Sequence, residues 1–168
     1  LFVADLLSYE EALGMVLAGC RPVGTERIGL ADAAGRVLAV APEVTTPLPP
    51  FANSAMDGFA VRASDVPAGG GRLPLDPGVP AGTDPPRLRP GFAVPIATGG
   101  PIPDGADTVV PIENASRADG YVTLPGGLAP GAHVRLAGTD LPPGPSPLTV
   151  GLPLDPAAGA MLAAIGAI

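Results

Sequence analysis

The chain of 168 residues contains no lysine and no tryptophan, and it has a single cysteine and a single histidine. Its nine basic residues are all arginines and form no cluster, so nucleic-acid binding is not expected. The lone Cys20 excludes an internal disulfide and a cysteine-rich zinc site. The longest nearly apolar run, residues 157–168, is twelve residues long, whereas roughly 20 are needed to cross a bilayer.

These scarcities also bear on location and chemistry. The amino-terminal residues lack a basic region before an apolar one, so no secretory signal peptide is expected. A single cysteine fits a reducing compartment, and we expect a cytoplasmic protein. The net charge of −7 suits solubility and indicates that a metal ion would mediate any binding of an anion. His133, between Ala132 and Val134, is expected to be a half-buried strand residue and not a catalyst.

Glycine and proline are abundant, with 24 of each. Such a content is found in disordered chains, but 46% of the residues are hydrophobic and only 15% are charged. Both residues also disfavour long helices. The composition therefore predicts a folded, β-rich protein with many turns and short strands.

Helices are predicted near the two ends of the chain. Ser8 and Glu11 form a capping-box pattern that begins a helix over residues 9–18. Its apolar residues recur at helical spacing, which predicts a face packed on a core, and they are Tyr9, Leu13, Val16 and Leu17. Asp155 and Pro156 are suited to the N-cap and first position of a second helix that begins near residue 157.

Two proline-rich segments divide the sequence. Residues 45–50 and 141–147 read as extended crossings, so residues 44–140 look like an insertion between them. Closely spaced turn residues within it predict an irregular β structure. Strands are expected at residues 25–30, 92–96, 108–112 and 121–124, and a single helical turn at residues 32–35.

Three small polar clusters are candidates for chemistry. The first is Asn53-Ser54-Ala55-Met56-Asp57-Gly58, which follows a rigid Pro49-Pro50 entry. The second is Thr98-Gly99-Gly100-Pro101-Ile102-Pro103, followed by residues 104–107. The third runs from Arg135 to Asp140.

Each cluster has a functional and a structural interpretation. Asp57 is either a loop carboxylate braced for chemistry or the cap of one helical turn in a Ser-x-x-Asp pattern. Thr98 and the two glycines form either an anion-binding nest or a tight turn that needs positive φ. Arg135 either pairs with an oxyanion or is solvated. Asp57 and Asp140 together are suited to hold Mg²⁺, although 83 positions separate them.

Taken in order, these clusters resemble the molybdopterin molybdotransferase family, which includes the bacterial MoeA proteins and the E domain of gephyrin. The resemblance rests on residues 50–61, with Gly35-Arg36-Val37-Leu38-Ala39 before them. It continues through residues 98–103 and 105–110, then Val134-Arg135 with Gly138 and Asp140, and finally residues 162–166. These motifs extend over about 140 residues in the family's order.

The resemblance implies a fold and a function. The fold is α+β and β-rich: an extended α+β domain of residues 1–43 and 141–168, interrupted by an inserted irregular β domain of residues 44–140. Family members are transferases of molybdenum cofactor biosynthesis. They insert molybdate into adenylylated molybdopterin with release of AMP, in a Mg²⁺-dependent step. An elongated homodimer is implied as well.

The resemblance also implies roles for individual residues. Asp57, Thr98 and Asp140 would be catalytic, and Asp57 and Asp140 would bind the metal. Ser54, Gly99, Gly100 and Arg135 would bind the cofactor substrate.

The sequence departs from the family in two respects. Family proteins continue into a pterin-binding α/β domain, and the chain ends before it, so the isolated chain is expected to be inactive. Thr139 stands where family members often have glutamate. Two alternatives stay open: a non-catalytic dimerisation or lid module that works with a separate pterin-binding chain, and a structural β-rich interaction domain.

Overall fold

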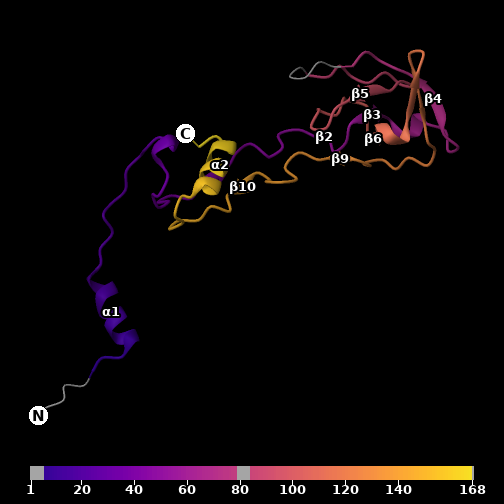
Figure 1. Cartoon of the computed structure of the whole chain (residues 1–168). Helices are drawn as coiled ribbons and strands as arrows, with labels where there is room; N and C mark the ends of the chain where they lie inside the picture. Colours follow the sequence, from indigo (N-terminus) through magenta and orange to yellow (C-terminus); the bar gives the residue numbers. More distant parts are fainter. Residues whose placement is uncertain (1–5, 79–83, 168) are drawn as a thin grey trace, which may run out of the picture.

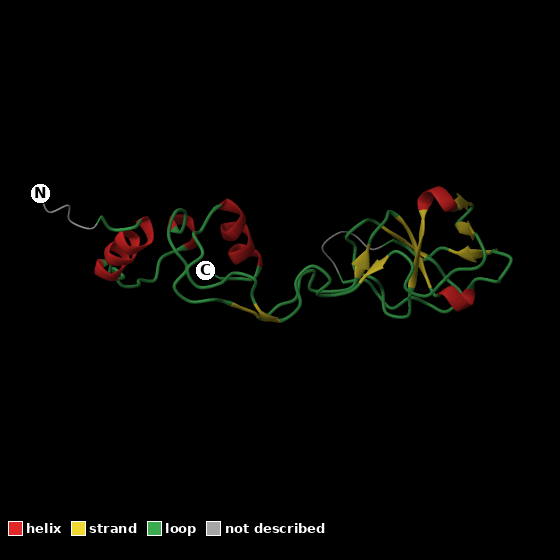
Figure 2. Ribbon diagram, turned by 90° about the horizontal axis from the view of Figure 1, so that it is seen from below, coloured by secondary structure: helices red, strands yellow, loops and turns green. Residues whose placement is uncertain are grey.

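The computed structural model describes residues 6–78 and 84–167. The chain is elongated, with helix α1 (Tyr9–Gly19) at one end, a small helical region in the middle and a β-rich body at the other end (Figure 1). Figure 2 shows two segments of the chain running side by side between the helical region and the β-rich body. No helix among the described residues is long and apolar enough to span a membrane.

Helix α1 forms as predicted, but it is exposed along its whole length. The Ser8 hydroxyl accepts a hydrogen bond from the Glu11 backbone N–H, and the Glu11 carboxylate accepts one from the Ser8 N–H. This is the predicted capping box. No residue of the helix is buried, so the expected packing of its apolar face on a core is wrong for this chain.

The middle region has its own small core. Helix α2 (Pro156–Ala164) begins where Asp155 accepts a hydrogen bond from the Ala158 N–H at 2.8 Å, as predicted. It lies against the 3₁₀ turn η1 (Leu30–Asp32). The buried residues come from segments that are far apart in sequence, namely Ala33, Leu148, Leu154, Ala158 and Leu162.

Two segments connect this region to the β-rich body. Strands β1 (Glu43–Val44) and β10 (Gly144–Pro145) pair in antiparallel fashion. A further bridge joins Leu48 to Leu141. The two proline-rich segments therefore run side by side, as expected for the two crossings of an inserted domain. The boundaries at residues 43/44 and 140/141 stay a prediction, because the pairing continues across them.

The β-rich body contains two three-stranded antiparallel sheets. One has the order β5-β3-β6, with bounds Val94–Ile96, Gly58–Val61 and Thr108–Pro111. The other has the order β4-β8-β7, with bounds Gly71–Pro74, Tyr121–Leu124 and Ser116–Ala118. Two short strands, β2 (Asn53–Ser54) and β9 (Val134–Arg135), pair beside them. The remaining elements are the 3₁₀ turns η2 (Ala63–Asp65) and η3 (Ile112–Asn114).

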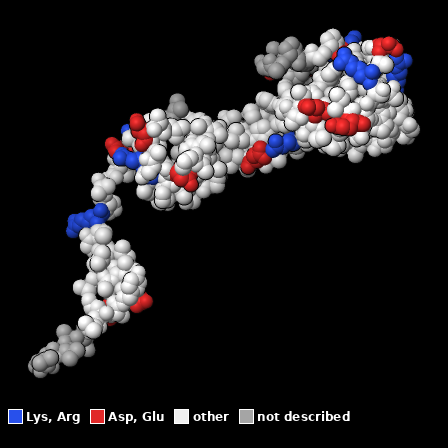
Figure 3. Space-filling view, viewed as in Figure 1, with Lys and Arg blue, Asp and Glu red and all other residues white. Residues whose placement is uncertain are grey.

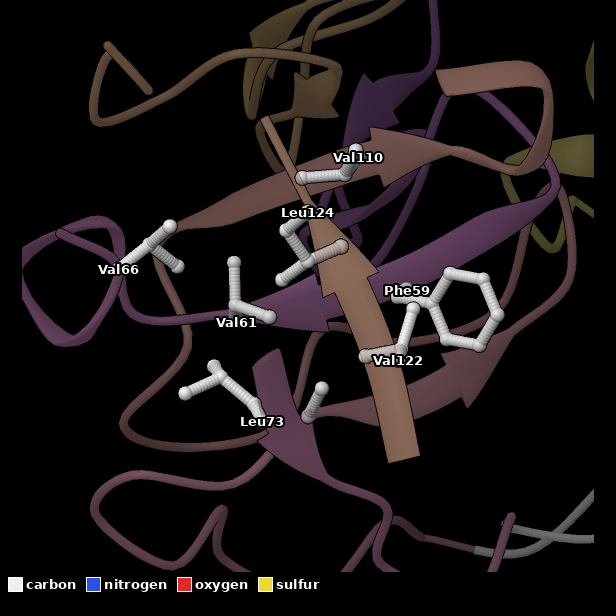
Figure 4. Packing of buried hydrophobic residues seen from close by; sticks show 8 residues of the cluster. Phe59, Val61, Val66, Leu73, Val110, Val122 and Leu124 are labelled. Atoms are coloured by element: carbon white, nitrogen blue, oxygen red, sulfur yellow. The ribbon is translucent and has the colours of Figure 1, made fainter. Parts of the chain in front are cut away.

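The two sheets enclose the main core. Figure 4 shows β8 crossing over β3, with Phe59 and Val61 facing Val122 and Leu124. Val61 and Val122 are fully buried. Pro111 ends the edge strand β6, where its missing N–H breaks no ladder, as predicted.

Two expectations of local structure are wrong. Residues 25–29 form no strand, and Leu30 begins the 3₁₀ turn η1. His133 is exposed and adopts a positive φ of 56° just before β9, so it is not a half-buried strand residue. The first error shows that alternation along the sequence does not by itself make a strand. The second has another cause: His133 lies in the turn that leads into β9, and its carbonyl accepts a hydrogen bond from the Ala55 N–H.

Candidate functional site

The three polar clusters meet around β2. The Ser54 N–H donates to the Gly100 carbonyl at 2.9 Å, and the Gly99 N–H donates to the Ser54 carbonyl at 2.8 Å. On its other side, β2 pairs with β9, which places Asn53 opposite Arg135. The first cluster is thus bonded through its backbone to both of the others, although they begin about 45 and about 80 residues further along the sequence.

Asp57 is exposed and braces the second cluster. Its Oδ1 atom accepts hydrogen bonds from the Thr98 N–H at 2.7 Å and the Thr98 hydroxyl at 2.8 Å. The backbone bond first, and the hydroxyl bond second, lower the pKa of Asp57 below its usual value. The interpretation of Asp57 as the cap of a helical turn is wrong, because residues 54–57 form no helix.

Ser54 instead shapes its own turn. Its buried hydroxyl accepts from the Met56 N–H at 3.2 Å and donates to the Met56 carbonyl. The hydroxyl is therefore satisfied within the turn that presents Asp57. The cofactor-binding role implied for Ser54 stays a prediction, and in this arrangement its hydroxyl is not available to a ligand.

The second cluster is a tight turn whose N–H groups are already used. Thr98 donates to Asp57, Gly99 to Ser54 and Gly100 to the Ala97 carbonyl. Gly99 has a φ of +79°, which explains the glycine. The structure thus agrees with the tight-turn interpretation, since an anion nest needs free donors. A contact from Gly99 or Gly100 to a cofactor stays a prediction and would require other atoms.

Gly58 fixes the position of Asp57. It lies on the central strand β3, between Ile96 of β5 and Pro111 of β6. A Cβ atom at Gly58 would lie 2.1 Å from the Val110 carbonyl oxygen. Glycine is therefore required here by close approach of backbone, in addition to the turn preference that its sequence context indicates.

The third cluster forms a closed turn with an ion pair. Arg135 donates from Nη2 to both carboxylate oxygens of Asp140, at 2.6 and 2.8 Å. The Thr139 hydroxyl donates to the Leu136 carbonyl at 2.7 Å. The Asp140 and Gly138 N–H groups donate to the carbonyls of Leu48 and Pro49, so the turn is anchored on the crossing. The side chains of Arg135 and Asp140 are 43% and 59% exposed.

The predicted pair of metal-binding aspartates is only half suited to Mg²⁺. One oxygen of Asp57 has no hydrogen bond within the described residues, so it fits as a single ligand to a hard cation. Both oxygens of Asp140 are held by Arg135. No group of three or more His, Cys, Asp or Glu residues in the described part of the chain is placed to hold a metal ion. Figure 3 shows charged side chains scattered thinly over the face in view.

Two features of the site were missed from the sequence. Ile112 lies beside Asp57, because its N–H donates to the Asp57 carbonyl at 3.0 Å, and the residue is 55% exposed. The β3–β6 register places it there, and the sequence carries no signal for that register. Asp107 is structural: its Oδ1 accepts from the Ala63 N–H at 2.7 Å and so tethers the end of β3.

The arrangement defines a class of protein: an elongated chain whose β-rich body carries an exposed aspartate and an arginine–aspartate pair. The protein-family model described as "MoeA N-terminal region (domain I and II)" matches residues 7–166. The chain belongs to this family.

Curated relatives have consistent names. The molybdopterin molybdenumtransferase of Synechococcus elongatus is 36% identical over 169 residues, which cover 96% of this chain and 42% of the relative. The molybdopterin molybdenumtransferase 2 of Mycobacterium tuberculosis is 35% identical over 163 residues, which cover 94% and 40%. The chain therefore spans about two fifths of the length of these relatives.

A solved structure agrees with the fold. The molybdopterin biosynthesis moeA protein from Pyrococcus horikoshii OT3 superposes with a TM-score of 0.89 at 33% identity, covering 96% of this chain and 44% of that one. The predicted α+β, β-rich fold of this family is thereby confirmed, and the family supports a place in molybdenum cofactor biosynthesis.

Proposed function

We propose that this chain forms one wall of the active site of a molybdopterin molybdotransferase, which inserts molybdate into adenylylated molybdopterin with release of AMP. Support comes from family membership and from the names of the relatives. The single observation that carries the proposal is the meeting of the three clusters at β2, which puts Asp57 and the Arg135–Asp140 pair on one small part of the body.

Asp57 has the clearest role. The two bonds from Thr98 hold its carboxylate in place and keep it ionised to a pH below its usual range. Its remaining oxygen is the ligand that this chain offers to Mg²⁺, and Mg²⁺ supplies neutralisation of phosphate charge when bound. Thr98 orients Asp57, and Arg135 binds an oxyanion through its guanidinium.

The site is open on one side. Asp57, Arg135 and Asp140 are all exposed, so each is within reach of another domain or chain. We propose that a pterin-binding α/β domain supplies the opposite wall, either in the same protein or from the partner in a homodimer. On this proposal the chain alone does not turn over, and the protein works in the cytoplasm.

Reconstitution tests this proposal. The chain is combined with the α/β domain of a family member, adenylylated molybdopterin, molybdate and Mg²⁺, and AMP release is measured. Asp57→Ala should lower the rate by about 100-fold, as expected for loss of a charge that acts on the reacting groups. Asp119→Asn removes a charge in the turn between β7 and β8, outside the three clusters, and should leave the rate unchanged. If Asp57→Ala releases AMP at the wild-type rate, the site assignment is wrong.

One observation favours the alternative of a non-catalytic lid module. The described residues hold no preformed metal site, and both aspartates are engaged by donors of the same chain. A lid would increase AMP release by a separate pterin-binding chain, and it would do so equally well with Asp57→Ala. The same reconstitution therefore separates the two functions.

A further inference from the structure

Arg135 is held by only one of its three nitrogens. Its Nη2 atom reaches both oxygens of Asp140, and within the described residues neither Nε nor Nη1 makes a hydrogen bond. A guanidinium carries five N–H donors in a fixed plane. Three of the five, on Nε and Nη1, are therefore unused, on a side chain that is 43% exposed.

The backbone around the pair is anchored on both sides. Arg135 lies on β9, paired with Asn53 of β2, and the Asp140 N–H donates to the Leu48 carbonyl. The Thr139 hydroxyl closes the turn between them. The Asp140 carboxylate thus holds the Nη2 end of the Arg135 guanidinium beside β2, on which Asp57 also depends.

We propose that Asp140 is a positioning residue that orients Arg135 for a tetrahedral oxyanion, and that it is not a metal ligand. The proposal deepens the function proposed above and rests on it. The oxyanion is either molybdate or a phosphate group of the adenylylated pterin, since both offer oxygen acceptors to the same donors. Metal binding at Asp140 would compete with Arg135 for the same carboxylate, because both of its oxygens already accept from Nη2 and the cation would repel the guanidinium.

The sign of one effect separates orientation from simple charge. Removing the Asp140 charge should by Coulomb attraction alone strengthen anion binding at Arg135 by several-fold at low salt. Loss of orientation weakens binding instead, because fixing a free arginine side chain costs about 2- to 12-fold in affinity. A high salt concentration screens the Coulomb effect beyond a few ångströms, whereas it does not change the cost of fixing the side chain.

The test uses the 168-residue chain and the Nε–H signal of Arg135 in ¹⁵N NMR, assigned by its loss in Arg135→Lys. Molybdate and inorganic phosphate are titrated separately, at about 0.15 M and about 1 M sodium chloride. We expect the signal to shift with one oxyanion or with both, which identifies the source. At the higher salt, Asp140→Asn should bind about 2- to 12-fold more weakly than the wild type.

Asp119→Asn is the matched control, because it also removes an exposed carboxylate that lies near an arginine, in this case Arg72. The backbone of Asp119 has a φ of 50°, which asparagine also tolerates. It should leave the Arg135 signal and both titrations unchanged. Equal or tighter oxyanion binding by Asp140→Asn at high salt overturns the proposal, and so does the absence of any shift with either anion.

Mg²⁺ supplies the remaining outcome. If Mg²⁺ alone moves the Arg135 signal to its position in Asp140→Asn, the carboxylate is a metal ligand and the proposal is wrong. None of these measurements needs AMP release, so failure of the proposed transferase activity is observed separately in the reconstitution.

Discussion

Replacing Gly58 by alanine should disrupt the contact between β3 and β6. An ideal Cβ atom at this position would lie 2.1 Å from the carbonyl oxygen of Val110, 2.9 Å from its carbonyl carbon and 3.0 Å from the Cα atom of Pro111. All three are backbone atoms, so no change of rotamer relieves the overlap. To restore a normal separation, β6 would have to move by more than about 1 Å.

The magnitude follows from what that movement disturbs. Overpacking a dense core costs about 1–3 kcal/mol, and Val110 is buried in the main core. The hydrogen bond from the Ile112 N–H to the Asp57 carbonyl lies next to the overlap, and losing it costs about 1 kcal/mol more. We expect a loss of about 3 kcal/mol in the free energy of unfolding of the β-rich body.

The assay is a guanidinium titration followed by the amide NMR signals of β3. Gly69→Ala is the matched control, because no atom lies within 4 Å of its ideal Cβ and its φ is not in the left-handed region. It should change stability by no more than about 0.5 kcal/mol. If Gly58→Ala is less than about 1 kcal/mol below the control, close approach of β6 does not explain this glycine.

Three further substitutions test other contacts. Thr98→Val removes the hydroxyl bond but keeps the N–H bond, so the pKa of Asp57, read from its carboxyl ¹³C shift, should rise part of the way to its usual value. Because folding lowers the pKa of Asp57, its contribution to stability is fully present above the usual pKa and is lost as the pH falls through the pKa of the folded state. An Asp57 pKa in Thr98→Val equal to that of the wild type would contradict this account. Ser8→Ala should destabilise α1 by about 1 kcal/mol and raise the pKa of Glu11. Amide exchange should become faster in α1 and stay unchanged in β3, because no residue of α1 is buried. Asp155→Ala should destabilise α2 by about 1 kcal/mol, measured by amide exchange. Asp32→Ala, at an exposed position, is the control, and a smaller effect of Asp155→Ala than of this control would rule out the capping role of Asp155.

Local rules account for much of the fold. The capping pattern at Ser8 and Glu11 and the Asp155-Pro156 pair each satisfy N–H groups within one turn, so they are visible in the sequence. The strand β8 forms at the predicted residues 121–124 because its alternation matches one buried and one exposed face. In all three cases the determining contacts lie within a few residues or follow from burial alone.

Features that depend on distant partners could not be predicted in the same way. The helical spacing of the apolar residues of α1 predicts a face packed on a core, yet no residue of this helix is buried in the described chain. The site shows the same limit. The sequence marks Asp57 and Thr98 as unusual, but only the pairing of β2 with the 98–100 turn brings the hydroxyl of Thr98 onto the carboxylate of Asp57.

Thr139 stands where the resemblance to the family leads us to expect glutamate, and the turn around it shows what threonine contributes there. Its hydroxyl donates to the Leu136 carbonyl at 2.7 Å, whereas its N–H donates to the same carbonyl over the longer distance of 3.3 Å. A glutamate here would have no hydroxyl to close the turn, and it would place a second carboxylate beside Asp140. Threonine exchanges that charge for a shorter, stronger closing bond, and it leaves Arg135 a single anionic partner in the turn. On the proposal above, a single partner on Nη2 restricts the orientations of the guanidinium and leaves its other edge to bind an oxyanion.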